Sequence, residues 1–151
     1  TRCGRDWSSD VCSSDLLDVW RDAMDLVALV YRFTATLPAE ERYGLSSQMR
    51  RAAVSVPSNI AEGAARRSAA ELIRFLSIAR GSLAELDTQI LLVERLGLAQ
   101  PDTELSQLLD RTFARLNALI RSKEQTSSVR EDAASYESPI TNYESRPQSH
   151  A

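Results

Sequence analysis

The chain has 151 residues and a formal charge of -3, and none of its apolar runs reaches the roughly 18 residues that read as a membrane span. Both cysteines lie among the first twelve residues and the only histidine is the penultimate residue. Residues 17–123 therefore cannot supply a Ser-His-Asp triad, a cysteine nucleophile, a zinc site of the usual type or a haem ligand. We expect a cytoplasmic protein that is not an enzyme and holds no metal or cofactor.

The first sixteen residues read TRCGRDWSSDVCSSDL and show neither a two-residue nor a 3.6-residue apolar period. Asp6 to Leu16 resembles the translation of a common short-read sequencing adaptor. We predict that residues 1–16 are an artefactual or disordered leader outside the fold. Cys3 and Cys12 then say nothing about disulfides or cellular compartment.

Two helices are expected between residue 17 and residue 63. In the first, apolar residues from Trp20 to Leu37 recur at spacings of three and four until Pro38 stops the run. The second follows the same spacing from Leu45 to Ile60, and Pro57 within it predicts a kink because proline removes a backbone donor. Gly63 is expected to end this helix in the left-handed conformation.

Two further helices complete residues 17–123. The third begins at Ser68, which forms a capping-box pattern with Glu71, and its apolar heptad seam runs to Val93 before Gly97. Pro101 and Asp102 open the fourth. Since the connections are short, the sequence predicts an all-α, antiparallel up-and-down four-helix bundle with a Pro-kinked second helix.

The last segment, residues 124–151, is rich in Ser, Glu and Pro and poor in large apolar residues. Such a composition cannot bury enough apolar surface to offset the entropy of ordering. We expect a disordered acidic and polar tail, and a solvated role for His150.

Arginine is the positive signal of the predicted bundle. Five arginines lie between residues 42 and 67 against a single acid, Glu62, and another follows at Arg74. Arginine forks bind phosphates well, so we predict a nucleic-acid-binding surface, for structured RNA, formed by Arg50, Arg51, Arg66, Arg67 and Arg74. The alternative is ordinary solvated charge, because residues 17–123 carry only one more basic than acidic residue.

A second candidate surface is the outer side of the second predicted helix. Small and apolar residues fall there opposite the core seam, namely Ser47, Val54, Ser58 and Ala61. They would allow another subunit to approach closely, so this face is a predicted oligomer interface, the alternative being scattered surface residues. The competing function is a protein-interaction module without nucleic-acid binding.

Three segments together resemble a known family. They read LDVWRDAMDLV, YGLSSQMRRAAVSVPSNIAEGAARRS and RFLSIARGSLAELDTQILLVERLG. In this order they resemble the small four-helix bundle proteins encoded by intervening sequences of bacterial 23S ribosomal RNA genes. The resemblance implies a homo-oligomer, with a pentamer as the arrangement of the wider superfamily. That superfamily includes accessory proteins of diversity-generating retroelements, which bind nucleic acid.

The resemblance also marks signature positions. On the second helix these are Arg50, Arg51, Ser55, Pro57, Ser58, Asn59, Glu62 and Gly63, and on the third Arg80, Gly81, Ser82 and Glu85. We expect structural roles for Pro57 and Gly63, and a close helix contact at Gly81.

Overall fold

The computed structural model describes residues 14–135, and this part of the chain is helical with no strand. The elements are α1 (Ser14–Thr34), the short 3-10 helix η1 (Ala39–Tyr43), α2 (Leu45–Ala64), α3 (Ala69–Arg95) and α4 (Thr103–Ser135). The all-α, four-helix prediction is confirmed.

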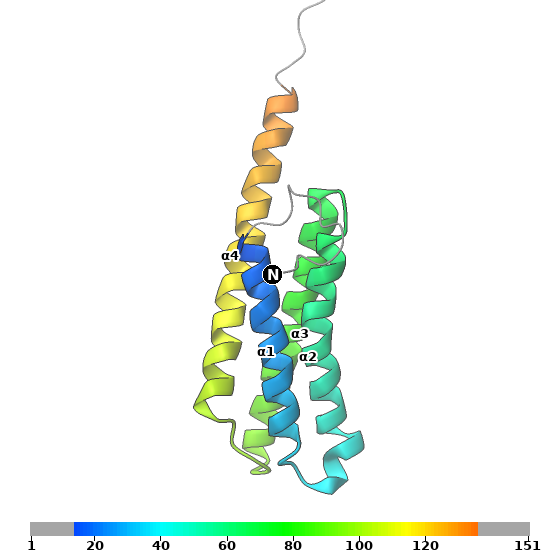
Figure 1. Ribbon diagram of the computed structural model, residues 1–151, viewed down its shortest axis with the longest axis vertical. Helices are drawn as coiled ribbons and strands as arrows, with labels where there is room; N and C mark the ends of the chain where they lie inside the picture. The colour runs from blue at the N-terminus through cyan, green and yellow to red at the C-terminus, as the bar shows by residue number, and fades with distance from the viewer. Residues whose placement is uncertain (1–13, 136–151) are drawn as a thin grey trace, which may run out of the picture.

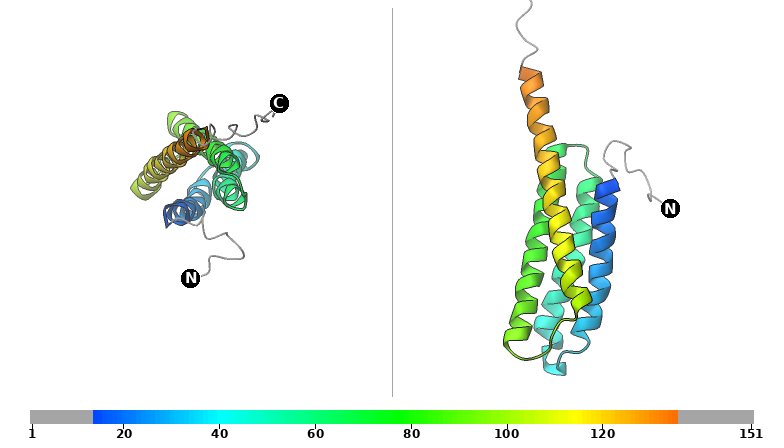
Figure 2. Two further views of the ribbon diagram at one scale, coloured as in Figure 1. Left: turned by 90° about the horizontal axis from the view of Figure 1, so that it is seen from above. Right: turned by 90° about the vertical axis from the view of Figure 1, so that its left-hand side faces the viewer.

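The four long helices stand side by side (Figure 1, Figure 2). The chain runs down α1, up α2, down α3 and up α4 in the view of Figure 1, with η1 at the lower end between α1 and α2. Each long helix contacts two others, since α1 packs on α2 and α4, and α3 packs on the same pair. The most extensive of these contacts joins α2 to α3. One core therefore lies along the common axis.

The heptad seams of α3 and α4 are buried as predicted. The buried residues of α3 run from Leu72 to Val93, and those of α4 include Leu105, Leu109, Thr112, Leu116 and Leu119. In α1 the prediction was only partly correct, because Trp20 and Val27 lie at the edge of the core. The rest of the predicted row is buried, and a second apolar row is buried beside it, formed by Val19, Leu26, Leu29 and Phe33.

Both ends of α3 are capped by local hydrogen bonds. The Ser68 hydroxyl accepts a hydrogen bond from the Glu71 amide (3.2 Å), as a capping residue does. Gly97 has a φ of 68°, in the left-handed region, and ends α3. The Gly97 amide donates to the Glu94 carbonyl and the Leu98 amide donates to the Val93 carbonyl, which is the bonding of a Schellman motif.

Gly63 behaves differently from its prediction. We expected a left-handed helix end there, but Gly63 lies within α2, which continues to Ala64, and among the described glycines only Gly97 has a positive φ. Gly63 is needed for space instead, because a Cβ at this position would lie 2.8 Å from the Phe75 Cβ of α3. The prediction failed because glycine serves both purposes and the sequence does not distinguish them.

Pro57 is buried inside α2, whose helix is continuous from Leu45 to Ala64. The side chains that follow the proline donate to carbonyls one turn back, Ser58 Oγ to Val54 O (2.8 Å) and Asn59 Nδ2 to Ser55 O (2.8 Å). Neither bond reaches the Ala53 carbonyl, which is the acceptor that loses its amide donor at Pro57. A kink at Val56 stays a prediction.

The helices extend past both predicted boundaries of the bundle. α1 begins at Ser14, and Leu16, assigned to the leader, is 0% exposed because it continues the apolar row of Val19. α4 continues to Ser135, well beyond residue 123, through a stretch without glycine or proline. Cys3, Cys12, His150 and the rest of the predicted leader and tail lie outside the described residues.

Candidate nucleic-acid interface

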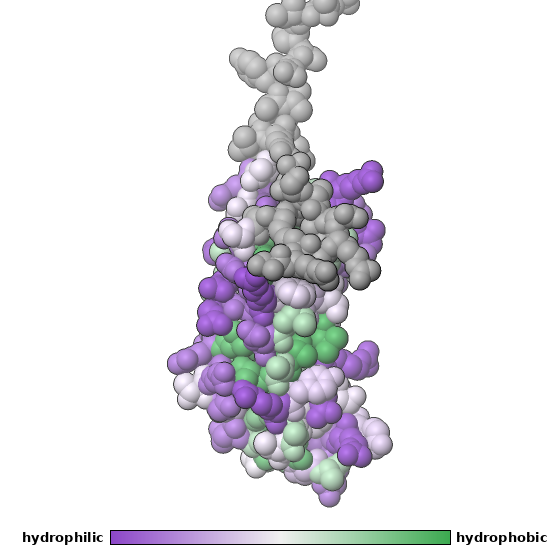
Figure 3. Space-filling model, in the orientation of Figure 1, coloured by the Kyte–Doolittle hydropathy of each residue, from purple (hydrophilic) through white to green (hydrophobic). Residues whose placement is uncertain are grey.

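A concave surface lies where α1, η1 and the first half of α2 meet. Its volume is about 580 Å³. We call it the basic groove, and it is lined by Tyr31, Arg42, Tyr43, Ser47, Arg50, Arg51, Val54 and Ser55. It combines three guanidinium groups with two tyrosine rings, and no carboxylate lines it. Figure 3 shows the face of the molecule on which α1 lies in front, where apolar surface alternates with hydrophilic residues.

The turn between α1 and α2 shapes one wall of the groove. Pro38 precedes η1, whose last two residues are Arg42 and Tyr43. The Glu41 carboxylate accepts a hydrogen bond from the Leu45 amide (3.2 Å) and so satisfies one free donor at the start of α2. Its negative charge is thereby directed at the helix end, while Arg42 and Tyr43 reach the groove.

Arg50 is held in place by α1. Its Nε donates to Thr34 Oγ1 (2.8 Å), and its guanidinium carbon lies 4.7 Å from the centre of the Tyr31 ring. The buried Thr34 hydroxyl donates in turn to the Tyr31 carbonyl (3.1 Å). A cation over an aromatic face is attracted by the electrons of the ring. These contacts fix the guanidinium before any ligand arrives.

Arg42 and Arg51 are exposed and free to bind an anion. Among the described residues, neither side chain forms an ion pair or a hydrogen bond. A guanidinium without a carboxylate partner presents its planar set of donors to solvent, and that geometry matches phosphate oxygens. The groove is therefore an electropositive concavity with one fixed and two adaptable arginines.

The five arginines of the sequence prediction do not form a single surface. Arg50 and Arg51 lie in the basic groove, whereas Arg66, Arg67 and Arg74 lie around the connection from α2 to α3. From Arg50 to Ala64, the last residue of α2, the helix rises about 21 Å, so the two groups lie far apart along α2. Arg66 pairs with Glu62, and its guanidinium lies 5.2 Å from the Phe75 ring centre, which Arg74 approaches to 6.0 Å. In this second group, Arg66 is therefore already engaged by a carboxylate and a ring of its own chain.

The matched family covers nearly all of the helical region. A model of the 23S rRNA-intervening sequence protein family matches residues 15–120. The chain belongs to this family. The match confirms the resemblance that the sequence segments indicated, and it spans α1 to the middle of α4. A comparison with curated proteins finds no match.

Several signature positions of the family resemblance form a polar chain between α2 and α3. Asn59 Nδ2 lies 3.0 Å from Ser55 Oγ, which lies 2.8 Å from Ser82 Oγ, and Ser82 Oγ donates to the Ile78 carbonyl (3.2 Å). Since Ser82 already donates to that carbonyl, the proton between the two hydroxyls belongs to Ser55. The chain fixes the register of the most extensive helix pair of the bundle.

Gly81, also a signature position, differs from its expected role. A Cβ built there would meet nothing within 4 Å among the described residues, so no helix of the same chain approaches it closely. Of the other signature residues, Glu85 accepts from Gln89 Nε2 (3.0 Å) and Arg80 Nη1 approaches Asn117 Oδ1 (3.5 Å). Gly81 is thus an exposed glycine inside a helix, where it lowers helix stability without any benefit to packing within the chain.

The residues predicted as an oligomer interface lie on the outside of α2. Ser47 and Val54 also line the basic groove, Ser58 is exposed, and Ala61 is half-buried. Across the Ser55–Ser82 hydrogen bond, α3 continues this outer face with the exposed Ile78 and Gly81.

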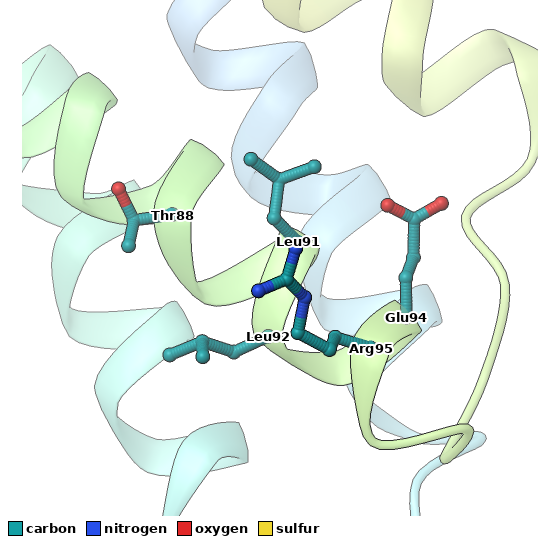
Figure 4. Close-up of a pocket in the computed structure, with 5 residues that line it drawn as sticks. All are labelled: Thr88, Leu91, Leu92, Glu94 and Arg95. Carbon is teal, nitrogen blue, oxygen red and sulfur yellow. The ribbon is translucent and has the colours of Figure 1, made fainter.

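Further apolar surface lies at the far end of α3. Leu91, Leu92 and Leu96 are exposed there, and a shallow concavity of about 590 Å³ is lined by Thr88, Leu91, Leu92, Glu94 and Arg95. Figure 4 shows these five side chains spreading from the last turns of α3. The exposed apolar residues of α3 thus lie at two places, at Ile78 in its first half and at Leu91 and Leu92 near its end.

Sequence reasoning missed both tyrosines of the groove. Tyr31 falls on the outer side of α1, and Tyr43 is in the α1–α2 connection, so neither belongs to a periodic pattern. The only local hint of a binding site in the sequence was Arg42 followed by Tyr43, just before Gly44.

Within residues 14–135 no group of three or more His, Cys, Asp or Glu side chains is arranged to hold a metal ion, and no helix there is long and apolar enough to cross a membrane.

Proposed function

We propose that this family member is a non-enzymatic, oligomeric scaffold that binds nucleic acid, specifically structured RNA, through the basic groove. The observation that carries the proposal is the groove itself, in which three arginines converge and no carboxylate lines the wall. Phosphate contacts of this kind supply most of the affinity of proteins that bind nucleic acid without sequence preference. The family's name refers to intervening sequences of 23S rRNA, which favours RNA as the ligand to test.

The test removes the two adaptable arginines and leaves Arg50, which also contacts α1. We expect Arg42→Gln together with Arg51→Gln to lower the affinity for 23S rRNA fragments about tenfold at low salt. The slope of log K against log salt should become shallower by about 1 to 2, since each lost phosphate contact removes roughly 0.7 to 0.9. Fluorescence anisotropy at several salt concentrations measures both quantities.

A matched control removes two positive charges elsewhere. Arg121 and Lys123 lie on α4, and neither lines the groove. Arg121→Gln with Lys123→Gln changes the net charge equally but should leave the slope and the affinity nearly as in the parent. Equal losses in both double variants would show that binding follows net charge rather than the groove.

Self-assembly is the second part of the proposal, and the pentamer of the wider superfamily is the form we propose. The outer face of α2 and α3 supports it, because Val54 on α2 and Ile78 on α3 are exposed, and Gly81, one turn after Ile78, is exposed as well. A glycine inside a helix costs about 1 kcal/mol relative to alanine, and close approach of a second copy would account for it. Ile78 and Gly81 do not line the basic groove, so this part of the face can serve assembly while the arginines bind the ligand.

Ile78 provides the test of assembly because it lies outside the basic groove. Ile78→Glu should shift the mass measured by light scattering at micromolar concentration from that of an oligomer to that of a single chain, while the helical circular dichroism is retained. Met24→Glu makes the same change at an exposed site of α1 and should leave the mass unaltered. A parent protein with the mass of one chain would refute this part of the proposal.

A further inference from the structure

Tyr43 is the most exposed large apolar residue of the described chain, at 89% exposure. It stands at the end of η1, between Arg42 and Gly44, and lines the basic groove. A ring with this exposure contributes almost nothing to the core, because its surface remains in contact with water. An aromatic residue placed beside arginines on a concave surface is typical of a site for nucleotide bases.

The rings of the two groove tyrosines differ in whether a cation covers them. Arg50 covers one face of Tyr31, with its guanidinium carbon 4.7 Å from the ring centre. No cation lies over the Tyr43 ring within the part of the chain that the structure describes. Tyr31 therefore positions Arg50, whereas the Tyr43 ring is available to a ligand.

We propose that the basic groove binds unpaired nucleotides and that Tyr43 stacks on one of their bases. This inference rests on the proposed function and names its substrate class. In a duplex both faces of a base are covered by its neighbours in the stack, so an exposed ring gains nothing from it. In a single strand, a loop or a bulge, a base can turn outward and present its face to tyrosine.

The shape of the groove favours the same class. The groove is a shallow, open concavity of about 580 Å³, which suits an extended strand lying across the surface rather than an enclosed small molecule. The arginines line a concave wall and are not carried on a protruding helix, whereas groove readers of duplex DNA present their side chains from a helix or ribbon that enters the duplex. Arg42 and Arg51 would hold the phosphates on either side of the stacked base. The unpaired parts of structured RNA satisfy these requirements.

The experiment compares a 12-nucleotide RNA single strand with the same strand annealed to its complement, using the full chain. The parent should bind the single strand at least tenfold more tightly. Tyr43→Ala should weaken single-strand binding roughly 5- to 150-fold, the range found for stacked aromatic residues. Tyr43→Phe retains the ring and should bind like the parent, whereas Tyr43→Leu retains apolar surface without the ring and should bind like Tyr43→Ala.

Salt dependence separates stacking from charge. Tyr43→Ala should lower the affinity without altering the slope of log K against log salt, while Arg42→Gln with Arg51→Gln should make that slope shallower. Equal binding of duplex and single strand, with Tyr43→Ala like the parent and the arginine variant weakened, would overturn this inference and leave the proposed function standing. Failure of the parent to bind either RNA would overturn both.

Discussion

Gly63→Leu should lower the free energy of unfolding by about 3 kcal/mol or more, because it forces α2 away from α3. The glycine lies where α3 comes close against α2. A Cβ there would be 2.8 Å from the Phe75 Cβ, 3.2 Å from Leu72 Cδ1 and 3.4 Å from the Leu72 carbonyl oxygen. The Phe75 Cβ is attached directly to the backbone, so only a shift of the whole helix relieves the contact.

Gly63→Ala is the more discriminating variant, since alanine is favoured over glycine in a helix by about 1 kcal/mol. The clash should exceed that gain and leave a net loss of about 1 to 2 kcal/mol. Gly81→Ala is the comparison on α3, where the added Cβ meets nothing within 4 Å in the chain; measured in the single-chain Ile78→Glu background, it should gain up to about 1 kcal/mol.

Guanidinium denaturation followed by circular dichroism gives the free energies of unfolding of these variants. Light scattering on the same folded samples separates a change of packing from a change of assembly. A gain in stability for Gly63→Ala equal to that of Gly81→Ala would mean that α2 and α3 are not in close contact at Gly63.

The buried seams of α3 and α4 were predictable because each of these helices carries one clear apolar heptad seam, and the structure buries that seam. α1 shows the limit of the same reasoning. Its sequence carries two adjacent apolar rows, one through Trp20 and Val27 and one through Val19, Leu26 and Phe33. Periodicity identifies a broad apolar face, and only the position of the neighbouring helices decides which row lies deepest.

The candidate site was predictable in its chemistry and not in its arrangement. The excess of arginine between residues 42 and 67 is a local property of the sequence. However, Arg50 lies in the first half of α2 and Arg66 lies just past its last residue, Ala64, so residues that are near along the chain are far apart in space. Tyr31 joins the groove from another helix, and such a juxtaposition has no periodic signal.

Asp22 is the clearest example of a contact without any local signal. Among other acids of α1 it resembles a solvated residue, but it is buried, with 5% exposure. Its carboxylate accepts two hydrogen bonds from Arg111, from Nη2 (3.0 Å) and Nε (3.2 Å), and one from Arg115 Nη1 (2.7 Å). Both arginines are on α4, so this cluster ties the first helix to the last.

Asp22→Ala should therefore lower the free energy of unfolding by about 2 kcal/mol. Removing one partner of a fully buried ion pair costs about 3 to 5 kcal/mol, because the other charge is left without compensation. The cost is smaller here since the Arg111 and Arg115 side chains are 54% and 46% exposed and can turn toward water. Asp22→Asn keeps the shape and loses the charge, so its loss should fall between those of the parent and Asp22→Ala.

Asp25→Ala is the matched control, because it removes the same charge and adds the same helix former at an exposed position three residues further along α1. It should leave stability within about 0.5 kcal/mol of the parent. A double-mutant cycle with Arg111→Gln then isolates the coupling across α1 and α4, which should be about 1 to 2 kcal/mol. Equal effects of Asp22→Ala and Asp25→Ala, or a coupling near zero, would show that the α1–α4 contact depends on its apolar seam alone. A coupling of the expected size would mean that one buried carboxylate on α1, paired with Arg111 and Arg115 on α4, stabilises the contact between the first and the last helix of the bundle.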